Sequence, residues 1–198
     1  GRIVPPCGGA AAELVLGRLD APALAELPVV LLRHDALYQR AGTPYGDGAG
    51  HPFADNHRRF ALLGLAAARL AQGQAGAWAP QVVHAHDWHA GLAGAYLHAG
   101  PPSAASVFTI HNLAYQGLFA RGVFAELGLP AQAWGMQGVE FHGQLSFMKA
   151  ALHYATRITT VSPSYAREIQ GSEFGCGLDG LLRERAAVVS GVLNGVDD

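Results

Sequence analysis

The sequence predicts an α/β fold in which a Rossmann-like parallel sheet carries helices on both faces. Four short apolar runs alternate with segments of helical periodicity, and they comprise residues 82–85, 106–110, 157–161 and 188–193. The runs are mainly hydrophobic rather than strictly alternating, which is typical of strands in a parallel sheet that is covered on both faces. Each run ends at polar residues. Because ligands bind outside the carboxyl ends of parallel strands, these polar residues predict one assembled pocket.

The first third of the chain contains one predicted strand and one predicted helix. Residues 1–28 are rich in Gly, Ala and Pro and predict no functional feature. Residues 28–32 (PVVLL) predict a short buried strand, and the Gly-punctuated segment 38–52 predicts a loop. Residues 55–72 predict an amphipathic helix that packs on the sheet, because their apolar side chains recur at helical spacing.

The remainder of the chain repeats strand, turn and helix. Two helices are predicted at residues 90–98 and 144–155, and a third begins at Pro163, where Ser162 is a suitable N-cap. The long stretch 113–143 shows no clear period. Because unstructured loops of that length are uncommon in compact domains, we expect it to be functional or to contain short helices.

Composition and length exclude several classes of protein. Half of the 198 residues are hydrophobic and the formal net charge is −2, which argues against disorder and against a nucleic-acid-binding surface. No apolar stretch approaches the roughly 20 residues that cross a bilayer. Cys7 and Cys176 lie far apart and match neither a disulfide framework nor a zinc-ligand pair, so we expect a reducing, cytoplasmic location. The chain starts at Gly1 and stops just after a predicted strand, so we expect a fragment of a longer protein.

A cluster of histidines at the end of the first parallel strand raises a metal hypothesis. His84 and His86 share one face of the predicted strand, and Asp87 and His89 lie on the turn beyond it. Three imidazoles and a carboxylate could bind zinc, as in a metal-dependent hydrolase. The other strand ends, however, offer His111 but no cluster of Asp, Glu or Cys to complete such a site.

A polyhydroxylated ligand is the better match to these strand ends. Asp87 can accept hydrogen bonds from ligand hydroxyls, although it could instead cap the following helix. His111 and Asn112 end the next strand, where imidazole and amide groups can both donate and accept. His111 could alternatively do no more than satisfy loop carbonyls. This mixture of groups is typical of sugar recognition.

Two further segments offer weaker candidates. Asn194 follows the last predicted strand, and either it contacts a ligand there or the Asn-Gly pair forms a hairpin turn. The loop that contains Tyr38 and Tyr45 bears two aromatic hydroxyls that could stack on or bond a sugar ring. The phosphate-binding motifs of P-loop and nicotinamide-dependent proteins and the Gly-x-Ser-x-Gly elbow of hydrolases are absent from the sequence.

Taken together, these residues resemble the bacterial glycogen synthases and plant starch synthases that use ADP-glucose. Five segments match in the family's order: residues 38–45 (YQRAGTPY), 82–91 (VVHAHDWHAG), 108–117 (FTIHNLAYQG), 160–166 (TVSPSYA) and 191–197 (GVLNGVD). The resemblance extends from about Leu37 to the end of the chain.

The resemblance implies a retaining glucosyltransferase of the GT-B type, with two facing Rossmann-like domains. Residues 1–198 would form most of the first, glucan-acceptor domain. Carried over from the family, His111 would contact the transferred glucose near the reacting carbon, with Asp87, Asn112 and Tyr38 beside it. Trp88 would shape the site, and Asn194 would lie near the glucose of the donor. The family's front-face route uses the donor diphosphate to help deprotonate the incoming 4-hydroxyl, so no metal or other cofactor is expected.

Two departures from the family pattern limit what this chain could do alone. The Lys-Thr/Ser-Gly-Gly-Leu loop near the family's amino terminus is absent, and so is the second, nucleotide-binding domain. We therefore expect the chain alone to be inactive. Its implied partners are ADP-glucose and an α-1,4-glucan, with no nucleic acid and no membrane. A domain that binds glucan without turning it over remains an alternative.

Overall fold

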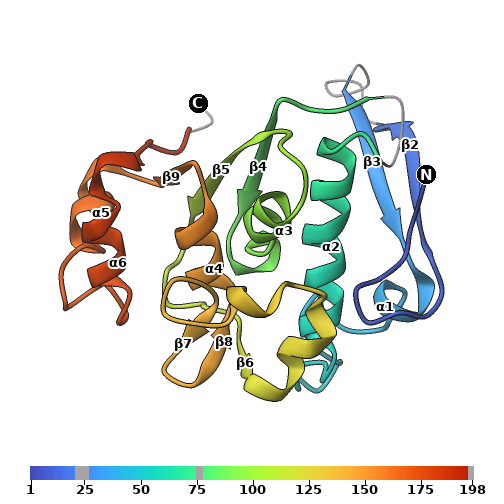
Figure 1. Ribbon diagram of the computed structural model, residues 1–198, viewed down its shortest axis with the longest axis horizontal. Coiled ribbons are helices and arrows are strands. Elements are labelled where there is room, and N and C mark those ends of the chain that lie inside the picture. The colour runs from blue at the N-terminus through green and yellow to red at the C-terminus, as the bar shows by residue number, and fades with distance from the viewer. Residues whose placement is uncertain (21–26, 75–77, 196–198) are drawn as a thin grey trace.

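The computed structural model describes residues 1–20, 27–74 and 78–195, and a four-stranded parallel sheet lies at its centre (Figure 1). The strands are β4 (Val82–His86), β5 (Ala105–Ile110), β9 (Arg157–Thr160) and β10 (Val189–Gly191), in the spatial order β10-β9-β5-β4. All three pairings are parallel, so their carboxyl ends meet at one edge. The predicted fold class is confirmed, although β10 is shorter than the predicted strand at residues 188–193.

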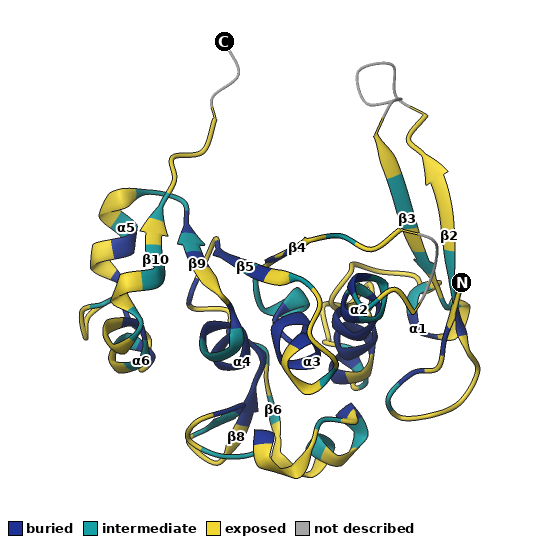
Figure 2. Cartoon of the chain, turned by 45° about the horizontal axis from the view of Figure 1, so that its top comes forward, coloured by how far each residue is buried: buried dark blue, intermediate teal, exposed yellow. Residues whose placement is uncertain are grey.

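Among the described residues, helices cover one face of this sheet, as Figure 2 shows, whereas the sequence predicted helices on both faces. The three that lie side by side there are α2 (Asn56–Ala71), α3 (Ala93–Ala99) and α4 (Phe147–Tyr154). Near the β10 edge are α5 (Pro163–Glu168), α6 (Asp179–Glu184) and the 3-10 turn η5 (Ala186–Val188). Val83, Ala85 and Phe108 are buried toward the helices, whereas His84 and His86 alternate onto the opposite, exposed side of β4.

Serine N-caps define the starts of two helices, α5 and α4. Ser162 caps α5 as predicted, because its Oγ accepts a hydrogen bond from the backbone N of Tyr165 at 2.9 Å. Ser146 caps α4 in the same way by accepting from the backbone N of Lys149 at 3.0 Å. The helix predicted at residues 144–155 therefore begins only at Phe147, and the residues before it form a strand.

The amino-terminal segment differs from the prediction. It forms an antiparallel sheet of β1 (Arg2–Ile3), β2 (Ala12–Arg18) and β3 (Pro28–Arg33), separate from the parallel sheet, and the short helix α1 (Asp35–Tyr38) follows. The predicted strand at residues 28–32 exists but is not buried, since Leu31 is 60% exposed. An apolar run specifies a strand but not the sheet that it joins, and here its partner β2 lies in a segment where no element was predicted.

The long stretch after β5 contains short elements, as expected. They are β6 (Leu118–Ala120), η3 (Arg121–Leu127), η4 (Ala131–Ala133), β7 (Glu140–Phe141) and β8 (Gln144–Ser146), of which the strands form a small antiparallel sheet. We call residues 113–143 the excursion after β5. Tyr96 on α3 holds it by donating from its hydroxyl to the carbonyl of Leu127 at 2.6 Å. Across the described ranges no helix is long and apolar enough to cross a membrane.

Candidate functional site

A cleft of about 740 Å³ opens at the carboxyl ends of β4 and β5. Its walls come from the loop before α2, from the turn after β4 and from the excursion after β5. The aromatic lining residues are Tyr45, Trp88, Tyr115 and Phe119, and the polar ones are Asn56, Asp87, His89 and Asn112. The structure thus brings five of the residues singled out in the sequence to one cleft, Tyr45, Asp87, Trp88, His89 and Asn112, whereas His111 is not among the lining residues.

Asp87 joins the ends of the two strands. Its Oδ1 accepts hydrogen bonds from the backbone N of His111 at 2.9 Å and of Asn112 at 3.4 Å, and its own N donates to the carbonyl of Thr109 at 3.0 Å. The side chain does not cap the 3-10 turn η2 (Trp88–Ala90) that follows. Its second carboxylate oxygen bonds to no described residue and can accept from a ligand.

The backbone of Asp87 is strained. Its φ of 52° and ψ of 179° lie in a region that residues other than glycine rarely occupy. Conformations of this kind cost on the order of 1–3 kcal/mol and persist only where the surrounding structure enforces them. The amides of His111 and Asn112 provide that enforcement, because they hold the carboxylate at the rim of the cleft.

His111 is held by a second histidine. Its Nε2 lies 2.9 Å from Nδ1 of His86, so one of the two nitrogens donates a proton and the other accepts it. His84 stacks on His86 with 4.2 Å between ring centroids, and its Nε2 bonds to Oγ1 of Thr109 at 2.6 Å. Burial lowers the pKa of His86, and the neighbouring His84 and His111 lower it further, against the opposing effect of Asp87. These effects favour an uncharged His86.

The metal hypothesis gains no support from this geometry. His84 and His86 do share a face of β4, but His89 turns into the cleft, where its ring packs against Trp88 at 4.2 Å and Tyr45 at 4.9 Å between centroids. Burial lowers the pKa of His89, which keeps it neutral among these rings. The part of the chain that the structure describes holds no group of three or more His, Cys, Asp or Glu side chains placed to bind one metal ion.

Trp88 forms the floor of the cleft. Its ring packs edge-on against Phe60 of α2, with 4.8 Å between centroids, and contacts Phe119 and Phe147 at 6.0 and 6.2 Å. Gly117 permits this packing, because its φ is 59° and a Cβ there would collide with the indole of Trp88. Asn112 stands at the rim, where its Oδ1 accepts from the backbone N of Ala114 at 3.0 Å. Its Nδ2 bonds to no residue that the structure describes.

Tyr38 is not part of the cleft lining, and its contact with a sugar stays a prediction. Its hydroxyl donates to the carbonyl of Arg59 at 2.6 Å, and burial raises its pKa well above the ordinary value. Tyr45, the other tyrosine of the same loop, lines the cleft instead and is 49% exposed. Helix α1 explains the difference, because it directs Tyr38 onto α2 while the loop beyond it carries Tyr45 to the cleft.

Asn194 lies away from the cleft lining. It is exposed and follows β10 by three residues, and β9 separates β10 from β5. Val196 and Asp197 of the same motif fall outside the described residues. A contact between Asn194 and the sugar of a donor stays a prediction.

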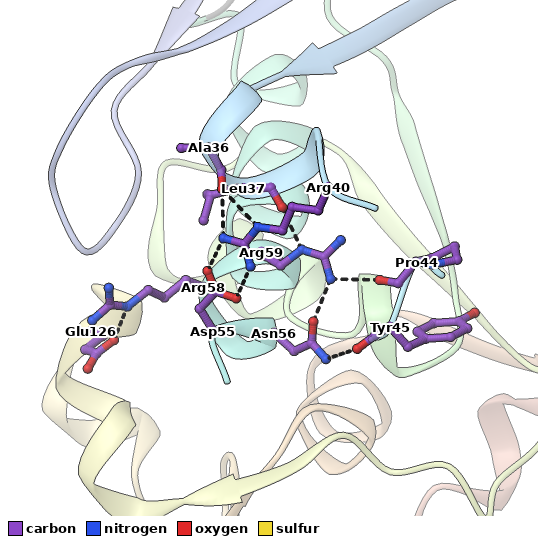
Figure 3. Close-up of polar contacts among 10 residues, drawn as sticks. All are labelled: Ala36, Leu37, Arg40, Pro44, Tyr45, Asp55, Asn56, Arg58, Arg59 and Glu126. Atoms are coloured by element: carbon purple, nitrogen blue, oxygen red, sulfur yellow. Dashed lines mark hydrogen bonds and ion pairs between the residues drawn. The ribbon is translucent and has the colours of Figure 1, made fainter. Parts of the chain in front are cut away.

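Sequence reasoning missed the residues that hold the Tyr45 loop. Arg59, on the first turn of α2, is 5% exposed and donates to the carbonyls of Leu37 and Pro44, both at 2.8 Å (Figure 3). Asn56 lines the cleft beside it. The helical periodicity of residues 55–72 gives no signal for this role, because it does not distinguish a buried arginine from a solvated one.

These features define an α/β domain of the Rossmann type, with its ligand cleft at the carboxyl ends of parallel strands. Comparison with known proteins identifies the family. Residues 11–184 match the family model described as the starch synthase catalytic domain, and the chain belongs to this family.

Similar proteins agree with that assignment. The glycogen synthase of Variovorax paradoxus (strain S110) is 59% identical over 194 residues, which cover 96% of this chain and 37% of the relative. The glycogen synthase of Leptothrix cholodnii is 57% identical over 192 residues, 94% of this chain and 39% of the relative. This chain therefore spans well under half the length of these curated relatives.

A solved structure supports the fold. The catalytic domain of starch synthase IV from Arabidopsis thaliana, bound to ADP and acarbose, superposes with a TM-score of 0.76 at 26% sequence identity. The match covers 100% of this chain and 40% of that one. The resemblance found from the five sequence segments is confirmed.

Proposed function

We propose that this chain is the glucan-acceptor half of a glycogen synthase, a retaining glucosyltransferase that moves glucose from ADP-glucose to the non-reducing end of an α-1,4-glucan. The observation that carries the proposal is that Asp87, which lines an aromatic cleft, accepts a hydrogen bond from the backbone N of His111, in a chain of the starch synthase family. The names of the glycogen synthase relatives and the ADP and acarbose bound to starch synthase IV support the same substrates.

The chemistry of the cleft suits a glucan. Sugar rings present apolar C–H faces that pack on aromatic side chains, and Tyr45 and Trp88 supply such surfaces. Sugar hydroxyls donate and accept hydrogen bonds, which the free carboxylate oxygen of Asp87 and the free Nδ2 of Asn112 can satisfy. The cleft volume of about 740 Å³ falls within the usual range of ligand pockets.

The proposed mechanism uses positioning and electrostatics. In the transfer, the bond between C1 of the glucose and the diphosphate oxygen breaks, and the acceptor 4-hydroxyl oxygen bonds to C1 on the same face. The hydroxyl proton passes to the departing diphosphate. Backbone amides hold one carboxylate oxygen of Asp87 and leave the other free to face the sugar. This carboxylate would help to stabilise the oxocarbenium-like charge, while His111 and Asn112 orient the glucose.

The rest of the machinery would lie outside these residues. Residues 1–198 would be a partial amino-terminal domain, and a second domain would grip the nucleotide, with Asn194 facing the glucose of the donor. We expect the whole enzyme to be cytoplasmic and to need no metal or other cofactor.

Two assays test the proposal. In glycogen-containing native gels, the purified chain should migrate more slowly than in plain gels, and it should not transfer glucose from ADP-glucose on its own. The whole protein that contains this chain should transfer glucose, and His111→Ala should reduce the rate by about 100-fold or more. Transfer unaffected by His111→Ala would contradict the catalytic proposal.

The alternatives give different results in the same tests. A glucan-binding domain without catalysis would be retarded in the gel, and its whole protein would show no transfer. A metal-dependent hydrolase would contain stoichiometric zinc that is lost on His86→Ala, and it would not be retarded by glycogen.

A further inference from the structure

Tyr45 reaches the cleft from the middle of a loop that connects α1 to α2 (Figure 3). Its ring lies 4.9 Å from that of His89 and 6.4 Å from that of Phe60, between centroids. The loop contains a tight turn in which Oγ1 of Thr43 accepts from the backbone N of Tyr45 at 3.2 Å and of Gly46 at 3.1 Å. This turn fixes the backbone conformation around Tyr45. It does not fix how far Tyr45 lies from the parallel sheet.

Asn56 connects this loop to helix α2. It is the first residue of the helix and is 5% exposed. Its Nδ2 donates to the carbonyl of Tyr45 at 2.7 Å, and its Oδ1 accepts from Nη1 of Arg59 at 2.6 Å. Both ends of the amide are therefore used, and its orientation is set by two different partners.

Arg59 completes the connection. Its guanidinium is buried without a carboxylate partner among the described residues, which is costly unless its donors are satisfied. They bond to the carbonyl of Leu37 before the loop, to the carbonyl of Pro44 next to Tyr45, and to Asn56. A buried cation that bonds both ends of one segment restricts that segment to a single position.

A second, more exposed pair ties the same loop at its base. Arg40 binds both carboxylate oxygens of Asp55 at 2.7 and 2.6 Å, and it also donates to the carbonyl of Ala36. This ion pair joins the second and the last residue of the loop (Figure 3). It leaves the placement of Tyr45 itself to Asn56 and Arg59.

We propose that Asn56 is a positioning residue which, together with Arg59, holds the Tyr45 ring against His89 as a preformed wall of the cleft and so sets the affinity for glucan. The effect on glucan affinity rests on the proposed function, whereas the positioning of the Tyr45 ring does not. A preformed wall avoids the entropic cost of ordering the loop when a sugar binds, and therefore increases affinity without adding a contact.

The substitution Asn56→Asp tests the positioning step. Aspartate keeps the shape of the side chain and the acceptor for Arg59, but it cannot donate to the carbonyl of Tyr45. One of its carboxylate oxygens would instead face that carbonyl oxygen. The chemical shifts of the His89 ring protons report on the nearby Tyr45 ring, and Tyr45→Ala measures the full size of that effect. We expect Asn56→Asp to produce at least half of the change that Tyr45→Ala produces.

A matched control comes from the other end of the same helix. Gln74 accepts from Nη1 of Arg69 at 2.5 Å, so Gln74→Glu makes the same amide-to-carboxylate change beside an arginine without touching the loop. It should leave the His89 shifts unchanged. If Asn56→Asp also leaves them unchanged in the folded chain, the positioning role is wrong. Should circular dichroism show that Asn56→Asp is unfolded, Asn56→Ser, whose side chain is too short to reach both partners, takes its place in the test.

Calorimetric titration with maltoheptaose tests the consequence for affinity. Asn56→Asp should weaken binding by about three- to tenfold. In a chain that already carries Tyr45→Ala it should cause no further loss, because Asn56 acts through Tyr45. Equal losses in both backgrounds would overturn the proposal. If the His89 shifts move but even the unsubstituted chain binds no maltoheptaose, the glucan site is refuted and the positioning of Tyr45 stands.

Discussion

Nδ1 of His86 lies 2.9 Å from Nε2 of His111, so the imidazole that follows β5 is oriented by an imidazole from the neighbouring strand β4. A pair of this kind holds one proton between its two nitrogens. Protonation of both rings would place two donors opposite each other and would break the bond. The bond that orients His111 therefore requires that at least one of the two rings stays neutral, and the effects that keep His86 uncharged help to preserve it.

Stability should consequently fall as the pH is lowered through the range in which His86 titrates. Burial lowers the pKa of His86 below the ordinary value, with contributions from His84 and His111. The unfolded chain then binds more protons than the folded one, so the contribution of His86 is complete above about pH 6.5 and is lost as the pH falls through the folded pKa. Urea unfolding at pH 7.5 and pH 5.5 measures the difference.

Other histidines set the background for that measurement. His89 and His153 also have lowered pKa values caused first by burial, so the unsubstituted chain loses stability in acid for several reasons. The informative comparison is His86→Gln, which cannot become charged. Its stability should fall less between the two pH values, and an unchanged pH dependence would show that His86 does not contribute.

The carboxylate of Asp87 gives a second prediction, on stability alone. Asp87→Ala leaves two backbone amides without their acceptor and should lower the free energy of unfolding by about 2–3 kcal/mol. Asp87→Gly loses the same bonds but relieves the positive φ, so it should be less destabilising than alanine by about 1 kcal/mol. Urea unfolding of the two variants measures this order, and the reverse order would show that the backbone is not strained.

The sequence predicted the parallel sheet and the strand ends because these depend on local patterns. His84 and His86 fall on one face of β4 through the two-residue period of a strand, and Asp87 and Asn112 follow strand ends whose positions an apolar run reveals. Neither the positive φ of Asp87 nor its bond to the amide of His111 has a signature in residue type.

The structure differs from the prediction where tertiary contacts decide which side chain faces the cleft or which strands pair. Tyr38 and Tyr45 occur in one motif, and only the path of the loop determines which ring faces the cleft. The run at Pro28–Arg33 has the composition of a buried strand but pairs with β2 at the exposed amino-terminal hairpin. In both cases the deciding partner is remote in the chain or lies in a segment without a recognisable pattern.

Gly117 provides a third prediction, about the floor of the cleft. Alanine at this position would place a methyl group against the indole of Trp88 and would have to adopt a positive φ. Gly117→Ala should therefore destabilise the chain by about 2–3 kcal/mol and shift the fluorescence of Trp88. Gly122→Ala is the matched control, because a Cβ there meets nothing within 4 Å, and its effect should stay within about 0.5 kcal/mol. Equal effects would contradict the packing described for Trp88.

Glu126 provides the last prediction, since it fastens the excursion after β5 to α2. Its carboxylate accepts from Nε of Arg58 at 2.5 Å and from Nε2 of His57 at 2.8 Å, and these partners lower its pKa to about 2. A lowered acid pKa stabilises the folded state at pH values above about 4.5, and that stability is lost as the pH falls toward 2. Glu126→Gln should reduce this acid sensitivity and increase amide exchange in residues 118–127.

The control for Glu126 distinguishes the loss of a carboxylate charge from the loss of the contact between residues 118–127 and α2. Arg183 and Asp179 form a comparable ion pair on α6 at 2.7 Å, away from the excursion. Asp179→Asn removes one carboxylate, as Glu126→Gln does, but it should leave amide exchange in residues 118–127 unchanged. Phe119, which lines the cleft, packs 5.8 Å from the ring of His57, so loosening the excursion should also lower the affinity for maltoheptaose. Exchange that rises equally in both variants would mean that Glu126 has no particular role in holding this wall.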